Sequence, residues 1–166
     1  MPRNSPQPLS SEMQTYLKQR VADVPHNAYC VDCLRNQATH FELTHAVFIC
    51  ELCAAIHYHQ FKPGKHLIKE IYTEQWDPTQ LKILAIASNQ EFFEYCRQYM
   101  IDQQPIKAKY NTKLAKWYRK KQANISRGFA FHEKPPENAR RNHENFGKEM
   151  NKGMNKVGKF FNDLFD

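Results

Sequence analysis

Four cysteines in two matched pairs constrain this chain more than any other feature. Cys30 and Cys33 form one Cys-x-x-Cys pair, sixteen residues follow, and Cys50 and Cys53 form the second. A tight turn at each pair directs two thiolates toward one ion, and the intervening loop returns the second pair to complete a tetrahedron. The pattern predicts one zinc ion with four thiolate ligands. Four protein ligands leave no open position for water, so the predicted zinc is structural.

Two other interpretations of the cysteines are less favoured by their spacing. A single Cys-x-x-Cys pair is also typical of a redox couple, but two pairs at a fixed interval are typical of a metal site. The fifth cysteine, Cys96, stands alone and is expected to be a small buried apolar residue. His57, His59 and His66 lie close together after the second pair, yet their spacing matches no recognised metal site.

Charge is distributed unevenly along the 166 residues. Residues 1–102 hold nine Lys/Arg and eleven Asp/Glu, whereas residues 103–166 hold fifteen and six, a net charge of −2 against +9. The last third is therefore a basic arm, which indicates an acidic partner: nucleic acid, anionic lipid or an acidic protein face. The cations proposed for this arm are Lys107, Lys109, Lys113, Lys116, Arg119, Lys120 and Lys121.

Helix and strand signals flank the cysteines. Ser11 and Gln14 resemble a capping box that opens a helix to about Asp23, before Pro25. A short strand is expected to enter Cys50, a helix to follow Cys53, and a strand to cover residues 66–73. Asp77 and Pro78 mark the start of another helix, and a further helix follows Asn89. No run of apolar residues is long enough to span a membrane, and the N-terminus has no apolar core of a secretory signal.

The chain divides into four expected parts. These are an extended segment (1–10), a zinc domain (11–121), an irregular linker (122–142) and a basic amphipathic helix (143–166). The helix carries one apolar stripe, for which a hydrophobic groove on a protein or an anionic membrane surface would be a suitable partner. Folding back onto the chain's own domain is the alternative. The stripe consists of Phe146, Met150, Met154, Val157, Phe161 and Leu164.

The cysteine pattern and its flanks resemble the Arf GTPase-activating protein (ArfGAP) zinc-finger domain. Asn27 precedes the first pair, the sixteen-residue interval is the same, and Ile56-His57 follows the second pair as in the family. Ser88-Asn89 is similar to the family's Gly-Asn. The resemblance covers about residues 11–120 and implies an α+β fold, with a short central antiparallel sheet flanked by helices and a basic helical C-terminal extension.

The resemblance also implies a catalytic arginine directly after the histidine, where this sequence has Tyr58. The positive charge of an arginine finger accelerates GTP hydrolysis by about 10³–10⁵-fold. A neutral phenol supplies no positive charge. The family's Trp between the cysteine pairs falls at His40, and its Asn-Leu-Gly falls at Thr44-His45-Ala46. The residues therefore predict a non-enzymatic module, a structural or interaction subunit of a larger, membrane-associated assembly.

Two alternatives remain open. The first is an active Arf-family GTPase activator with a relocated cation, either Arg35 or a lysine of the loop that contains Lys62 and Lys65. It would bind a small GTPase. The second is a nucleic-acid-binding protein, which is disfavoured because no base-reading motif is present. The expected location is intracellular, cytoplasmic or at a membrane, with a mitochondrial complex as the alternative.

Overall fold

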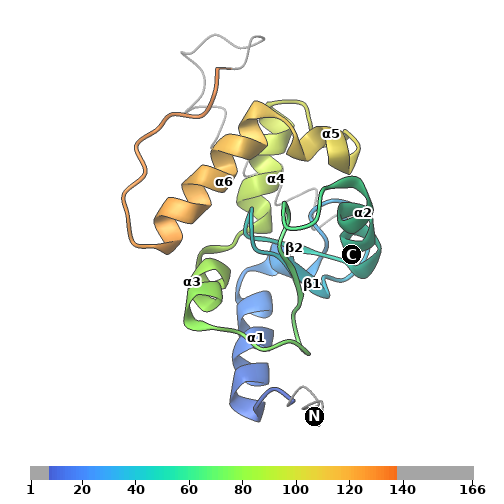
Figure 1. Cartoon of the computed structure of the whole chain (residues 1–166), viewed down its shortest axis with the longest axis vertical. Coiled ribbons are helices and arrows are strands. Elements are labelled where there is room, and N and C mark those ends of the chain that lie inside the picture. Colours follow the sequence, from blue (N-terminus) through green and yellow to red (C-terminus); the bar gives the residue numbers. More distant parts are fainter. Residues whose placement is uncertain (1–7, 138–166) are drawn as a thin grey trace.

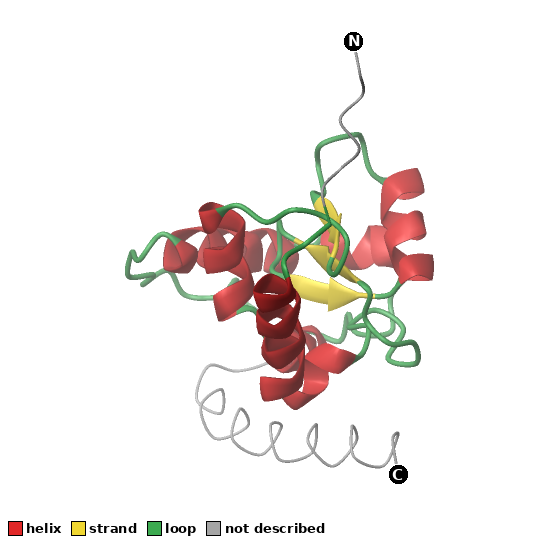
Figure 2. Ribbon diagram, turned by 90° about the horizontal axis from the view of Figure 1, so that it is seen from below, coloured by secondary structure: helices red, strands yellow, loops and turns green. Residues whose placement is uncertain are grey.

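The structure is a computed structural model and describes residues 8–137. Figure 1 shows helices surrounding a small sheet, and Figure 2 shows the strands at the centre of the molecule with helices on both sides. In chain order the elements are α1 (Ser11–Asp23), the 3₁₀ helix η1 (Pro25–Ala28), β1 (His40–Glu42), β2 (Val47–Ile49), α2 (Glu51–Gln60), β3 (Ile68–Glu70), α3 (Pro78–Ile86), α4 (Asn89–Gln98), α5 (Ile106–Tyr110) and α6 (Lys113–Ser126).

The sheet has the order β2-β1-β3, and both pairings are antiparallel. Phe41 at the centre of β1 lies opposite Phe48 of β2 and Lys69 of β3. The β2 strand is buried at all three positions, because a core covers each of its faces. The α+β fold with a short antiparallel sheet flanked by helices is therefore confirmed.

Two apolar cores lie on the two sides of the sheet. One contains the cysteines together with residues of α4, α5 and α6, and its centre includes Phe92 and Tyr118, whose ring centroids are 4.9 Å apart. The other is formed by α1, α3 and the opposite side chains of the sheet, including Leu17, Phe41 and Leu84. Because the strands are short, these two cores, rather than strand pairing, fix the position of the sheet.

Two buried asparagines join the halves of the molecule. The Asn89 side chain accepts a hydrogen bond from Phe48 N at 2.8 Å and donates to Phe48 O at 2.9 Å and to Tyr29 O at 2.8 Å. Its backbone N donates to Asn27 Oδ1 at 2.9 Å, and Asn27 donates to Ala87 O at 3.2 Å. These bonds satisfy backbone groups that would otherwise be buried without partners. The first residue of α4 is thereby fixed against β2 and η1.

Several predicted element boundaries need correction. The cap of α1 is Ser10, which accepts a hydrogen bond from Met13 N, and not Ser11. The strand expected over residues 66–73 is shortened to Ile68–Glu70, because Glu70 N donates to the Glu74 side chain and the chain turns there. The Asp77 cap with Gln80 is confirmed as a reciprocal capping box.

The C-terminal boundary of the domain lies beyond the predicted residue 121. Helix α6 continues to Ser126, and Gly128 then adopts φ +81°, the left-handed conformation common at helix ends. The next residues return along α6 (Figure 1), where Trp117 Nε1 donates to Glu133 O at 3.0 Å. Residues 122–137 are thus packed on the domain. The expected helix over 143–166 and its apolar stripe lie outside the described residues.

None of the helices within residues 8–137 has the length and apolar character needed to cross a membrane.

Candidate functional site

The four cysteines of the two pairs converge on one point. Their Sγ atoms all lie within 4.8 Å of one another, and Cys33 Sγ and Cys50 Sγ are 3.8 Å apart. A tetrahedral zinc with Zn–S bonds of about 2.3 Å requires sulfur atoms about 3.8 Å apart. The donor set, the spacing and the burial of three of the four cysteines therefore fit one closed, four-thiolate metal site.

Local backbone geometry explains why the sulfurs meet. Cys30 N donates to Asn36 O and Leu34 N to Cys30 O, each at 2.9 Å, and Leu34 takes a φ of 57° to close the first turn. Cys50 is the cap of α2, and Cys53 N donates to Cys50 Sγ at 3.4 Å. A hydrogen bond from the Cys53 thiol is the largest influence that lowers the pKa of Cys30 to about 6. This environment favours the thiolate of Cys30, the form that binds a metal, whereas burial raises the pKa of Cys33 and the hydrogen bond with Cys30 raises the pKa of Cys53.

Asp32, between the first two cysteines, anchors the metal site to two helices. Its side chain is 1% exposed and accepts from His57 Nε2 at 2.9 Å, Tyr110 OH at 3.0 Å and Lys109 Nζ at 3.3 Å. Burial raises the pKa of Asp32, but the His57 hydrogen bond and the Lys109 charge outweigh it and hold the pKa below its ordinary value. Asp32 therefore remains ionised and joins the cysteine loop to α2 and α5.

A second buried polar cluster, which sequence reasoning missed, surrounds Glu42. Its carboxylate accepts from Thr44 N and His45 N at 2.9 Å and from His45 Nδ1 at 2.7 Å. Nearby, His66 Nδ1 lies 2.8 Å from His57 Nδ1. Of the three histidines considered from the sequence, His59 is exposed and takes no part. The missed signal was Glu42-x-x-His45 in a turn between two buried strands.

Tyr58 occupies the position where the family resemblance predicts arginine, and it lies on the outer face of α2. It is 60% exposed, and its OH donates to Ile68 O at 3.4 Å. Partial burial and Glu74 raise the pKa of Tyr58, so the phenol is neutral at pH 7. The outer face of α2 also exposes Leu52 and Ile56. It is thus an apolar face that carries no cation at residue 58.

The candidate replacement cations differ in their surroundings. Lys65 Nζ donates to Asn111 Oδ1 at 2.9 Å and lies 5.1 Å from the centroid of the Phe61 ring, so it is held against α5. Arg35 and Lys62 are exposed, and neither forms an ion pair within the part of the chain that the structure describes.

The predicted basic arm is only partly a solvent-facing surface. Lys109 is 3% exposed and buried against Asp32, so it does not belong to an accessible basic face. Lys121 pairs with Glu91 and lies over the rings of Tyr95 and Tyr118. The cations of the arm that remain exposed are Lys107, Lys113, Lys116, Arg119 and Lys120, the last of which pairs with Glu133.

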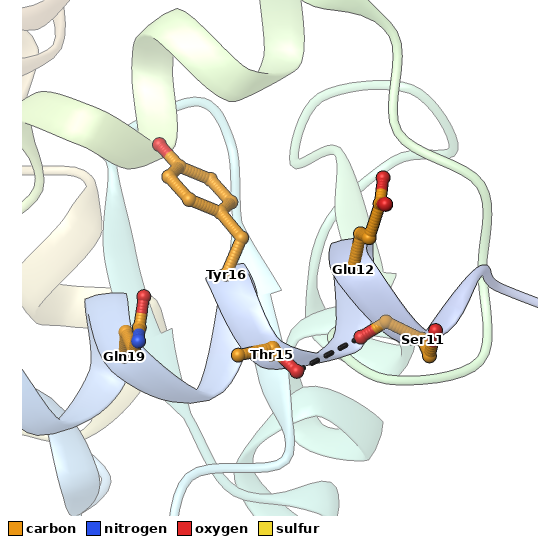
Figure 3. Close-up of a pocket in the computed structure, with 5 residues that line it drawn as sticks. All are labelled: Ser11, Glu12, Thr15, Tyr16 and Gln19. Atoms are coloured by element: carbon orange, nitrogen blue, oxygen red, sulfur yellow. Dashed lines mark hydrogen bonds between the residues drawn. The ribbon is translucent and has the colours of Figure 1, made fainter.

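A shallow hollow lies on α1, remote in sequence from the cysteines (Figure 3). It is lined by Ser11, Glu12, Thr15, Tyr16 and Gln19, all from one helix. Thr15 Oγ1 is already bonded to Ser11 O at 2.9 Å, and no cysteine or histidine lines the hollow. We assign no chemistry to it.

Comparison with known proteins places this geometry in a family. The model of the ArfGap family, described as "Putative GTPase activating protein for Arf", matches residues 15–127, more than half of the chain. The chain is 29% identical over 117 residues to ADP-ribosylation factor GTPase-activating protein 3 of Bos taurus. That match covers 69% of this chain and 22% of the relative. The Mus musculus protein of the same name is 29% identical over 105 residues, 61% of this chain and 20% of that one.

A solved structure has the same fold. A protein from Cryptosporidium parvum, described as a "putative GTPase activating protein for ADP ribosylation factor", aligns with a TM-score of 0.60 and 23% identity. The alignment covers 72% of this chain and 95% of that one. By contrast, the chain spans only about a fifth of the length of the curated relatives that it matches.

These findings correct the prediction that the chain is not an enzyme. That prediction rested on Tyr58 together with the departures at His40 and Thr44-His45-Ala46, but the family and the relatives named above are GTPase-activating proteins, and none of these comparisons indicates a non-enzymatic member. The structural role in a membrane-associated assembly gains no support from them. The four-cysteine site, the antiparallel sheet and the match over residues 15–127 together show that the chain belongs to the ArfGap family.

Proposed function

We propose that this chain accelerates GTP hydrolysis by an Arf-family small GTPase. The observation that carries the proposal is the family match over residues 15–127, which includes both cysteine pairs, the sheet and the exposed face of α2. The relatives that match this same region are named for that activity.

One structural zinc ion at Cys30, Cys33, Cys50 and Cys53 is part of the proposal. The sulfur spacing supports it, because the 3.8 Å separation of Cys33 and Cys50 is the edge of a Zn–S₄ tetrahedron. When bound, the zinc holds the start of α2 against the first cysteine loop. It takes no part in the reaction, since four thiolates leave no site for water or substrate.

The catalytic cation must come from a residue other than Tyr58. We favour Arg35, because a guanidinium remains charged and can contact two phosphate oxygens at once. Arg35 lies on the loop that Asp32 fastens to the buried side of α2 through a 2.9 Å bond to His57, the residue before Tyr58. Lys62 is the second candidate, and Lys65 is already engaged by Asn111.

The test is GTP hydrolysis by GTP-loaded Arf proteins, measured in single turnover with the full chain in zinc-containing buffer. We expect a rate well above that of Arf alone, a loss of roughly 10²-fold or more for Arg35→Ala, and little change for Lys113→Ala, an exposed control. Tyr58→Arg should restore activity to the Arg35→Ala variant. No acceleration by the wild type, with zinc bound and the fold intact, would contradict the proposed function.

A further inference from the structure

Helix α6 and the turn after it form a basic surface that ends in an exposed aromatic ring. The helix holds five Lys/Arg and no Asp/Glu. Lys116, Lys120 and Arg127 follow one another at intervals of four and seven residues, so they lie on one side of the helix, and all three are exposed. Phe129, in the turn, is 62% exposed. We call these four residues the tip surface.

The turn fixes the backbone of Phe129 without giving its ring an apolar partner. Gly128 N donates to Ile125 O at 2.9 Å and Phe129 N donates to Asn124 O at 3.1 Å, the paired bonds of a Schellman motif. In that motif, an apolar residue at the position of Phe129 commonly packs on the residue at the position of Asn124. Because Asn124 is polar, the phenyl ring gains no apolar contact there and most of its surface remains in water.

The chain on the far side of the turn is packed on α6. Phe131 contacts Trp117, with ring centroids 5.8 Å apart, and Trp117 Nε1 donates to Glu133 O at 3.0 Å. The turn is therefore held by the helix on one side and by these contacts on the other. Figure 1 shows it at an outer edge of the molecule, so Phe129 faces outward from a fixed position.

The positive charge of the tip surface is available to an external anion. Lys116 and Arg127 form no ion pair within residues 8–137. Lys120 pairs with Glu133, but the two side chains are 60% and 48% exposed. An exposed pair of this kind contributes little to stability and is screened by salt, so it does not prevent Lys120 from contacting another anion.

Two features favour an anionic lipid surface over nucleic acid as the partner. A bilayer interface attracts Lys and Arg and accepts an apolar ring among its headgroups at the same time. Binding of single-stranded nucleic acid uses aromatic rings on which bases stack. Trp117 and Tyr118, which interleave the lysines of α6 in the sequence, are 7% and 0% exposed and are core residues.

We infer that the tip surface binds an anionic membrane, with Lys116, Lys120 and Arg127 against the headgroups and Phe129 inserted between the lipids. The surface lies apart from the outer face of α2, on the other side of the molecule in Figure 1. It is therefore additional to the proposed GTPase activation and does not rest on it.

The first test is sedimentation of the zinc-loaded full chain with vesicles of equal parts phosphatidylcholine and phosphatidylserine. We expect binding that weakens as salt is raised, and little binding to phosphatidylcholine alone. The double variant Lys116→Gln with Lys120→Gln should bind about 20-fold more weakly. Lys18→Gln with Lys82→Gln removes the same charge from exposed positions of α1 and α3, and should leave binding nearly unchanged.

The second test concerns the ring. Phe129→Ala should weaken binding to the anionic vesicles by about tenfold, because the apolar area that enters the interface is lost. Leu52→Ala is the matched control, since Leu52 is 68% exposed on α2, and it should not change binding.

Phe129→Trp provides a readout that does not depend on a loss of binding. The natural Trp76 and Trp117 are 8% and 7% exposed, so the new indole reports on the turn. Its fluorescence emission should shift to shorter wavelength with the anionic vesicles and stay unchanged with phosphatidylcholine alone.

Three results would overturn the inference. These are no binding of the wild type to the anionic vesicles at low salt, an equal loss of binding in the two double variants, and no emission shift in Phe129→Trp. Retention on duplex DNA without vesicle binding would assign the surface to nucleic acid instead. None of these measurements uses GTP hydrolysis, so their failure leaves the proposed function untouched.

Discussion

Asp32 and Glu42 are both buried carboxylates bonded to histidine, yet different cations surround them. Asp32 has Lys109 Nζ at 3.3 Å in addition to His57 and Tyr110. Glu42 has His45 and two backbone N–H groups, and no lysine or arginine within the described residues. The Asp32 carboxylate is therefore paired with a lysine ammonium, whereas the Glu42 carboxylate is held by an imidazole and two backbone N–H groups.

Removing zinc should have the largest effect on stability, because Asp32 lies on the loop that carries Cys30 and Cys33. Chelation, or Cys50→Ser, should abolish the cooperative unfolding transition of the domain, since the free energy of zinc binding by four thiolates contributes directly to the free energy of folding. Thermal unfolding followed by circular dichroism measures this. Cys96→Ala, a buried cysteine outside the sulfur cluster, should retain a cooperative transition. A metal-free chain with an unchanged transition would show that the cysteines are not a structural site.

Asp32→Asn should cost about 3–5 kcal/mol in unfolding free energy, because it leaves the buried Lys109 ammonium unpaired. Urea denaturation of the zinc-bound chain measures the loss. The double variant Asp32→Asn with Lys109→Met removes both charges and should be more stable than Asp32→Asn alone. If the second substitution brings no recovery, the lysine is not the reason why the two carboxylates differ.

Glu42→Gln should cost less, about 2 kcal/mol, because no permanently charged side chain is left unpaired. The loss comes from the weaker hydrogen bonds of an amide to Thr44 N, His45 N and His45 Nδ1. The same urea experiment, with Glu12→Gln as an exposed control, measures it. A loss equal to or larger than that of Asp32→Asn would reverse the comparison.

The smallest expected effect is a pH dependence from His66, whose pKa is lowered by burial to about 4. Unfolded His66 takes up a proton below about pH 6.5, while the folded residue stays neutral down to about 4. Its contribution to stability is therefore complete above pH 6.5 and is lost as the pH falls toward 4. Between pH 7.5 and 5.5, the loss should be about 1 kcal/mol.

Urea denaturation at these two pH values, with one zinc ion per chain, measures the His66 effect. His66→Gln should remove about 1 kcal/mol of the pH dependence, whereas His59→Gln should leave it unchanged. An identical pH dependence in wild type and His66→Gln would mean that the imidazole is not held neutral by the fold.

Sequence reasoning predicted local features well. The four cysteines come together as expected, and the buried Cys96, the Asp77 cap and the strand before Cys50 depend on residues within a few positions of one another. The prediction about enzymatic activity failed for a different reason. It inferred the function of a whole domain from a few departures, at Tyr58, His40 and Thr44-His45-Ala46, while the family match extends over residues 15–127.

The sequence alone determined that this chain would fold around a four-cysteine site. Its two Cys-x-x-Cys turns stand at a fixed interval, and each turn orients its own thiolates. Only the tertiary structure showed that Lys109 does not belong to the exposed basic surface. Its ammonium group is bonded to Asp32, 77 residues away in the sequence. Only the tertiary structure brought Glu42 and His45 beside His66 and His57. Such contacts depend on how α2, α5 and the sheet pack, and no short-range pattern encodes that packing.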